Sequence, residues 1–232
     1  MRAPGTVSFA YSTPTRTRPT SVGRREHARA DAVRTLSIVA VCTINLVIGV
    51  RYCWLIRRGR ISPALAMWAF FTIATVGSLL TYLGEGLYSP LDNILNTADI
   101  LLVGTVTVWI AVYGDRSTRF TRFDLGCLAA VTAIVIAWAV TRQHVVAHSA
   151  IQAILVIAYF PVVRRLWRAE RNTESFTMWI GLMIAPVFSL LSSQGVLATV
   201  YAVRAIVCTG LLMTLMTRAV RRERTRHARR AG

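Results

Sequence analysis

Residues 55–84 read LIRRGRISPALAMWAFFTIATVGSLLTYLG, and residues 166–195 read LWRAERNTESFTMWIGLMIAPVFSLLSSQG. When the two stretches are aligned with an offset of 111 residues, twelve of the thirty positions are identical. The shared residues include an Arg-x-x-Arg pattern followed, seven residues later, by Met-Trp. Two unrelated apolar helices would rarely share these features in one register. The chain therefore contains an internal repeat.

The composition around this repeat is that of a membrane protein. Apolar residues make up 54% of the 232 residues, and charged residues make up only 16% and gather in short runs. The mean hydropathy is +0.50. A helix needs about 20 apolar residues to cross about 30 Å of hydrocarbon. The sequence predicts an all-α polytopic membrane protein with seven transmembrane helices, at about 35–56, 65–83, 93–113, 124–140, 146–166, 176–195 and 196–217.

The charge distribution excludes several classes of protein. All 27 basic residues are arginine, so the chain has no lysine to form a retinal Schiff base, and a light-driven rhodopsin is excluded. The net charge of +17 comes from arginines that flank apolar segments, which indicates membrane topology rather than nucleic-acid binding. The partners that we expect are the lipid bilayer and a small polar solute, with no nucleic acid; a homo-oligomer is compatible with this interpretation. The lack of lysine is typical of a GC-rich genome and points to a bacterial plasma membrane.

Arginine counts in the loops predict the orientation. The loops at 57–60, 116–122 and 164–171 and the C-terminal tail together hold 17 arginines, whereas the opposite loops hold only Arg142. Because positive loops stay in the cytoplasm, we expect a cytoplasmic C-terminus and, with seven spans, an external N-terminus. The seven arginines of the N-terminal tail oppose this orientation. Either the tail is translocated despite its charge, or the number of spans differs by one, or translation starts further along the chain.

The two copies of the repeat follow the first and the fifth segments, so both cross the membrane in the same direction. This predicts two parallel three-helix repeats joined by a connector helix, an arrangement in which transporters place one site between two similar halves. The predicted domains are a disordered Arg/Pro/Thr-rich tail (1–30), a first repeat (31–114), a connector helix (115–141), a second repeat (142–217) and a basic cytoplasmic tail (218–232).

The region between the fifth and sixth segments resembles a known family. A proline near the end of one span precedes a basic hinge, and a polar turn then opens the next span. The residues that match are Tyr159, Pro161, Arg164, Arg168, Asn172, Thr173, Glu174 and Ser175. Together with the 3+1+3 layout, they resemble the PQ-loop family, which includes the SWEET and SemiSWEET sugar transporters, cystinosin and the KDEL receptor. The resemblance implies alternating-access transport with Pro161 at a hinge, and Pro186 in the sixth segment is a second candidate hinge.

The family's name-giving glutamine is replaced here by Val162. The asparagines that line the SWEET sugar site in the third and seventh spans have no clean counterpart: Asn93 and Asn96 lie in the third segment, and the seventh has none. The resemblance therefore does not extend to a sugar as the solute. We still expect Asn93 and Asn96 to contribute to the substrate site.

Two charged residues lie deep inside predicted spans. Asp99 and Arg204 lie six to eight positions from the outer ends of their helices, which is roughly 9–12 Å by helical rise. A charge at that depth needs a partner or a water-filled cavity. We expect the two residues to face one another across a central cavity. They either bind a charged group or a proton of the substrate or form a static ion pair that locks two helices.

Other polar residues give weaker signals. His144 and His148 are spaced as metal ligands on a helix, but no third ligand lies nearby in the sequence, so we expect interface histidines and no metal or cofactor. The tryptophans at 54, 68, 167 and 179 suit an aromatic belt at the membrane surface. We see no motif of an enzyme. The alternatives to a transporter are a receptor or sensor on the same fold and a structural membrane protein.

Overall fold

The computed structural model describes residues 21–61, 63, 65–114, 122–160, 163, 166, 167 and 175–231, and within these residues every regular element is a helix. The seven α-helices and one 3-10 helix follow the predicted apolar segments in order. They are α1 (Ser21–Arg57), α2 (Leu65–Leu83), η1 (Pro90–Asn93), α3 (Ile94–Tyr113), α4 (Arg122–Thr141), α5 (His144–Ile157), α7 (Phe176–Ser189) and α8 (Gly195–Ala231).

The lengths and surfaces of these helices suit a membrane. Three of the helices in the described residues are long and apolar enough to cross one, over His27–Arg57, Pro90–Tyr113 and Gly195–Thr225. The other four α-helices have shorter apolar stretches of 10–17 residues. Large apolar side chains also point outward: Leu46 is 67% exposed, Leu101 71% and Val140 79%. Exposed apolar area on this scale marks contact with lipid or another apolar partner.

The two long helices extend into the terminal segments. The first helix begins at Ser21, so residues 21–30 are helical where the sequence predicted a disordered tail. The last helix continues through the predicted basic tail as far as Ala231. Neither extension contains a proline, and from residue 24 to 48 and from 218 to 231 there is no glycine either. Arginine and alanine favour the helix, so an apolar helix propagates into these charged segments.

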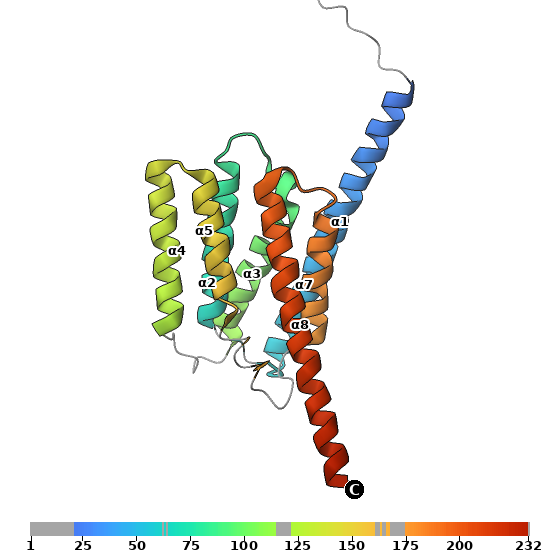
Figure 1. Cartoon of the computed structure of the whole chain (residues 1–232), viewed down its shortest axis with the longest axis vertical. Coiled ribbons are helices and arrows are strands. Elements are labelled where there is room, and N and C mark those ends of the chain that lie inside the picture. The colour runs from blue at the N-terminus through green and yellow to red at the C-terminus, as the bar shows by residue number, and fades with distance from the viewer. Residues whose placement is uncertain are drawn as a thin grey trace, which may run out of the picture.

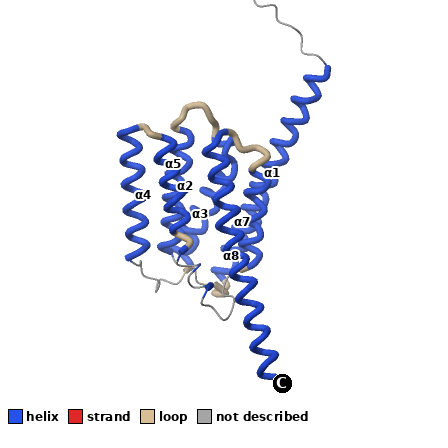
Figure 2. Tube along the Cα trace, viewed as in Figure 1, coloured by secondary structure: helices blue, strands red, loops and turns tan. Residues whose placement is uncertain are grey.

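The helices form one bundle in which neighbours in the chain run in opposite directions (Figures 1 and 2). Within the first part of the chain α3 packs against both α1 and α2, and within the last part α8 packs against both α5 and α7. Between the two parts, α1 packs against α7 and α2 packs against α5. α4 lies at the edge of the bundle against α2 and α5 (Figure 1).

One end of the bundle, which we call the upper end, carries the turns at 84–93, 142–143 and 190–194 (Figure 1). Arg34 of α1 forms an ion pair there with Asp92 of η1. The backbone N–H of Gln194 donates to the carbonyl of Asp92 at 2.9 Å, and the Tyr82 hydroxyl donates to the carbonyl of Gln194 at 2.9 Å. Gly195 starts α8 with a φ of +79°, and a Cβ there would lie 2.6 Å from the Tyr88 hydroxyl oxygen. Glycine is therefore required at this turn.

Candidate functional site

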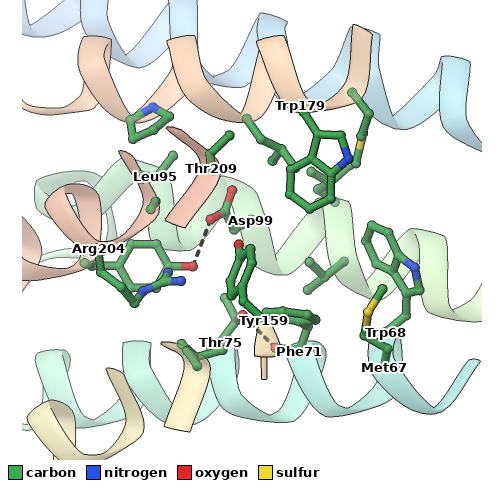
Figure 3. Close-up of a pocket in the computed structure, with 18 of the residues that line it drawn as sticks. Met67, Trp68, Phe71, Thr75, Leu95, Asp99, Tyr159, Trp179, Arg204 and Thr209 are labelled. Carbon is green, nitrogen blue, oxygen red and sulfur yellow. Dashed lines mark hydrogen bonds between the residues drawn. The ribbon is translucent and has the colours of Figure 1, made fainter. Parts of the chain in front are cut away.

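A cavity of about 100 Å³ lies at the centre of the bundle. Helices α1, α2, α3, α5, α7 and α8 and the residues that flank α5 and α7 supply its walls, and among the described residues α4 supplies none of them. The lining residues are Tyr52, Met67, Trp68, Phe71, Thr75, Leu95, Asp99, Leu102, Val103, Leu155, Tyr159, Ser175, Met178, Trp179, Leu182, Pro186, Tyr201, Arg204, Ala205 and Thr209 (Figure 3).

The cavity walls from α2 and α7 come from equivalent positions of the repeat. The α2 residues Met67, Trp68, Phe71 and Thr75 line the cavity, and the residues 111 positions later line it from α7. Those α7 residues are Met178, Trp179, Leu182 and Pro186. Their spacing of i, i+1, i+4 and i+8 places them on one face of each helix.

Two of the four tryptophans assigned to a surface belt instead line this cavity. Trp68 is only 7% exposed, and Trp179 contacts the ring of Tyr159 with 6.3 Å between ring centroids. Trp54 and Trp167 do lie on the surface, 43% and 55% exposed, where arginine side chains lie over their rings. The belt assignment was wrong for Trp68, which is buried, and Trp179 is half-buried with its ring against the cavity, because position along the helix gives depth but not the direction in which a side chain points.

Asp99 and Arg204 line the same cavity from α3 and α8. They are not joined directly, because within the described residues the single ion pair with N–O contact of 4.0 Å or less is Arg34–Asp92. Tyr201 links them instead: its hydroxyl donates to Asp99 Oδ2 at 2.8 Å, and the Arg204 guanidinium lies over its ring, 4.7 Å from the centroid. Figure 3 shows Asp99 between Arg204 on one side and the rings of Trp179 and Trp68 on the other. The second oxygen of Asp99, Oδ1, is buried and has no hydrogen-bond partner in the described part of the chain.

A buried polar network holds Arg204 in place. Its Nε donates to Gln152 Oε1 at 2.7 Å, and Gln152 Nε2 donates to Ser78 Oγ at 2.8 Å. His148 continues the network, with a ring nitrogen 3.3 Å from Gln152 Nε2 and the other 3.2 Å from Thr81 Oγ1. These bonds join α2, α5 and α8. Polar side chains buried among apolar helices need such partners, so the network fixes the position of the guanidinium.

The two asparagines proposed for the substrate site lie outside the cavity lining. Asn93 caps the first turn of α3, where its side chain accepts a bond from the backbone N–H of Asn96. Asn96 is fully buried and bonds to Ser78 Oγ at 3.0 Å, which ties α3 to α2. Asn93 therefore stabilises the start of its own helix, and Asn96 holds two helices together. The sequence indicated their segment but not the face of the helix that they occupy.

Of the two candidate hinges, Pro186 lies within the described residues and Pro161 does not. Pro161 lies outside the described residues, as do most of the residues that carry the family resemblance. Pro186 lies inside α7, is buried and lines the cavity. A proline has no N–H to bond the carbonyl four residues earlier, so the α7 backbone lacks one bond at Leu182.

The histidine pair is divided between two separate environments. His144 Nδ1 accepts a hydrogen bond from Trp138 Nε1 at 2.9 Å at the turn between α4 and α5. His148 lies one turn further into α5 and belongs to the buried network. Across the part of the chain that the structure describes, no group of three His, Cys, Asp or Glu residues is arranged to hold a metal.

Several residues that line or support the cavity were not predicted from the sequence. Tyr201 lies three positions before Arg204, which is a spacing that places both on one helix face, and this signal was available. The two Met-Trp pairs were also available, because the repeat singled them out. Gln152 gave no comparable signal, since a single neutral side chain in an apolar segment points to no particular partner.

The site thus combines one acidic and one basic side chain with a wall of aromatic rings, in a cavity between helices. Such a cavity can bind a small polar or charged molecule in a fixed orientation. No protein-family model, curated protein or solved structure matches the chain, so the function must be inferred from this geometry.

Proposed function

We propose that this protein is a secondary transporter that moves a small polar solute through the central cavity by alternating access. In this proposal all seven α-helices cross the membrane as two parallel three-helix units, residues 31–114 and 142–217, with α4 as the connector. The packing supports this division, because α3 lies between α1 and α2 just as α8 lies between α5 and α7. The contacts of α1 with α7 and of α2 with α5 are likewise equivalent under the repeat.

The observation that supports transport most strongly is the symmetry of the cavity walls. Four residues of α2 and the four residues of α7 at the repeat offset of 111 line one cavity. A site between two similar halves is accessible from either side of the membrane when the halves rock against each other.

Contacts between the two units at the upper end support a closed gate on that side of the cavity. Ser37 of α1 donates to the carbonyl of Phe188 at 2.6 Å, and its Oγ lies 2.7 Å from Ser192 Oγ. Tyr82 of α2 bonds to the carbonyl of Gln194. All of these bonds join the first unit to the second, and all of them have to break if the units separate at this end.

The same proposal places the chain in a bacterial plasma membrane. The loops with many arginines face the cytoplasm and the upper end faces outward, as the positive-inside rule requires. The PQ-loop resemblance agrees with this arrangement and with a proline-assisted movement of helices.

Flux measurements test the proposal. Purified protein in proteoliposomes is assayed with sugars, amino acids and vitamins, beside a Ser37→Cys/Ser192→Cys variant made after the four native cysteines are replaced. We expect flux of at least one solute, its loss when the new cysteines are oxidised, and its return on reduction. Each single cysteine variant is the control and keeps its flux after oxidation.

Absence of flux for every solute, together with saturable binding, would favour a receptor. Absence of both would favour a structural protein. Flux that persists after the two cysteines are cross-linked would rule out the upper end as a moving gate.

A further inference from the structure

We infer that the central cavity recognises a small zwitterion, with a methylated ammonium group at one end and a carboxylate at the other. The inference names the substrate class of the proposed transporter and rests on that function only for the transport step. The binding step depends on the geometry of the cavity alone.

The site for the positive group is Asp99. Its Oδ2 accepts the Tyr201 hydroxyl, but its Oδ1 is buried and has no hydrogen-bond partner among the described residues. A carboxylate oxygen left in this state at the depth of a membrane helix is costly. A bound cation would remove that cost, because charges attract strongly where water is excluded.

The chemistry of the positive group follows from the aromatic side chains in the cavity wall. Phe71 contacts Tyr159 with 5.7 Å between ring centroids, and Tyr159 contacts Trp179 at 6.3 Å. On the α1 side Tyr52 contacts Trp68 at 5.1 Å. These rings and Asp99 line one cavity, and aromatic rings together with a carboxylate are the groups that bind quaternary ammonium ions.

A primary ammonium suits this wall less well than a methylated one. Its three N–H donors need acceptors, and a buried donor without one is unfavourable. Much of the wall near Asp99 is aliphatic, from Leu95, Leu102 and Val103, and the Thr75 hydroxyl already donates to the carbonyl of Phe71 at 2.6 Å. Methyl groups need no acceptors and pack against rings and leucines.

Arg204 is the reason to expect a negative group on the ligand that carries the ammonium group. Its guanidinium is held over the Tyr201 ring and bonded to Gln152, so its positive charge stays at the cavity wall. A simple cation would neutralise the charge of Asp99, but its own positive charge would be repelled by Arg204. A zwitterion matches both charges at once, because its carboxylate is attracted to Arg204. The cavity of about 100 Å³ is enclosed by side chains from six helices, so the molecule must be small.

Binding measurements on the purified full-length protein in detergent test the inference. Glycine betaine is the probe, and choline, glycine and glucose lack the carboxylate, the methyl groups and both charges, respectively. We expect glycine betaine to bind about tenfold more tightly than each of the three, which is the effect of a single good charge or ring contact. The variants Asp99→Asn and Trp179→Leu should each weaken its binding about tenfold.

Trp54→Leu is the matched control, because Trp54 lies on the outer surface and does not line the cavity. It should leave glycine betaine affinity within about twofold, as expected for a surface residue remote from the site. Size-exclusion profiles and thermal unfolding show whether each variant is folded. If Asp99→Asn does not fold, Trp179→Leu and the comparison of the four probes still decide the result.

Choline binding as tightly as glycine betaine would overturn the zwitterion, and tighter binding of glycine would overturn the methylated ammonium. Preference for glucose would overturn the inference altogether. Tight binding of glycine betaine without flux would uphold the recognition and contradict transport. Flux of another solute without glycine betaine binding would uphold transport and contradict the recognition.

Discussion

At the level of single residues, neutral polar side chains position the two buried charges. Asp99 is bonded to Tyr201 and Arg204 to Gln152, and each bond joins two different helices. Polar side chains in membrane helices face the bundle interior and pair there, because lipid offers them no partner. The indirect link through Tyr201 leaves one carboxylate oxygen of Asp99 available, whereas a bidentate ion pair with Arg204 would occupy both oxygens.

Removing the Tyr201 hydroxyl should destabilise the protein. In Tyr201→Phe the Oδ2 atom of Asp99 loses the Tyr201 hydroxyl, so neither carboxylate oxygen has a hydrogen-bond partner among the described residues. We therefore expect the free energy of unfolding to fall by about 1–2 kcal/mol. Thermal unfolding in detergent measures the change. Tyr113→Phe is the control, because Tyr113 is 53% exposed at the end of α3, and this change should stay within about 0.5 kcal/mol. Equal effects of the two substitutions would show that the bond to Asp99 contributes nothing.

Asn96 gives a prediction that separates protein stability from solute binding. Asn96→Ala removes the bond to Ser78 that ties α3 to α2, so we expect a loss of stability of about 1–3 kcal/mol. Because Asn96 does not line the cavity, the KM of solute flux should stay within about twofold of wild type. A KM raised about tenfold at unchanged stability would show that Asn96 contributes to the substrate site.

At the level of elements, α7 combines a cavity wall with a weak point in its backbone. Pro186 interrupts the hydrogen bonding of the helix at the Leu182 carbonyl, and serine hydroxyls bond other carbonyls nearer the end of the helix. Ser189 Oγ donates to the carbonyl of Pro186 at 2.8 Å, and Ser193 Oγ donates to the carbonyl of Ser189 at 2.9 Å. The equivalent position in α2 is Thr75, so the repeat has a proline on one side only.

Replacing this proline should make α7 stiffer. In Pro186→Ala the new N–H can bond the Leu182 carbonyl, and the alanine favours the helix, so we expect a higher unfolding temperature. If α7 bends during transport, the flux rate should fall severalfold, on the order of threefold or more. Val187→Ala tests the neighbouring exposed position and should change neither property appreciably. A lower unfolding temperature with unchanged flux would mean that Pro186 contributes packing and no movement.

At the level of the whole molecule, the two ends of the bundle differ in charge and in the chain termini they carry. α1 begins beyond the upper end, and α8 finishes far beyond the opposite end (Figure 1). The last helix continues as a row of arginines from residue 218 onward, and the α1–α2 turn at the same end carries Arg58 and Arg60. The upper turns carry Arg142 and little else that is basic, whereas the part of α1 at and beyond this end carries Arg24, Arg25, Arg29 and Arg34.

This asymmetry predicts the orientation in the membrane. Reporter fusions placed after Gly86, Arg142 and Gly232 should read outside, outside and inside, because loops rich in arginine remain in the cytoplasm. Fusions with activity on only one side of the membrane, such as alkaline phosphatase and green fluorescent protein, measure this. A C-terminal fusion that reads outside would reverse the orientation, and an N-terminal tag that reads inside would change the number of spans.

The sequence by itself determined the helical class and the extent of most elements. Seven apolar segments predicted seven helices, and those with clear polar boundaries, such as 65–83, begin and end as predicted. Hydrophobic length is a local property that a chain displays without its neighbours. The repeat also singled out the Met-Trp pairs, and the number of residues from each helix end predicted similar depths for Asp99 and Arg204.

Only the tertiary structure decided which side chains share the cavity. Trp68 turns inward and Trp54 outward although both lie near the same end of the bundle. Asn96 bonds a neighbouring helix, while Asp99, three residues later, reaches the centre. In an apolar helix every face is hydrophobic, so the usual periodic pattern that marks the inner face is weak. The direction of a side chain then depends on how six helices pack around one space, and that is a property of their arrangement rather than of any one segment.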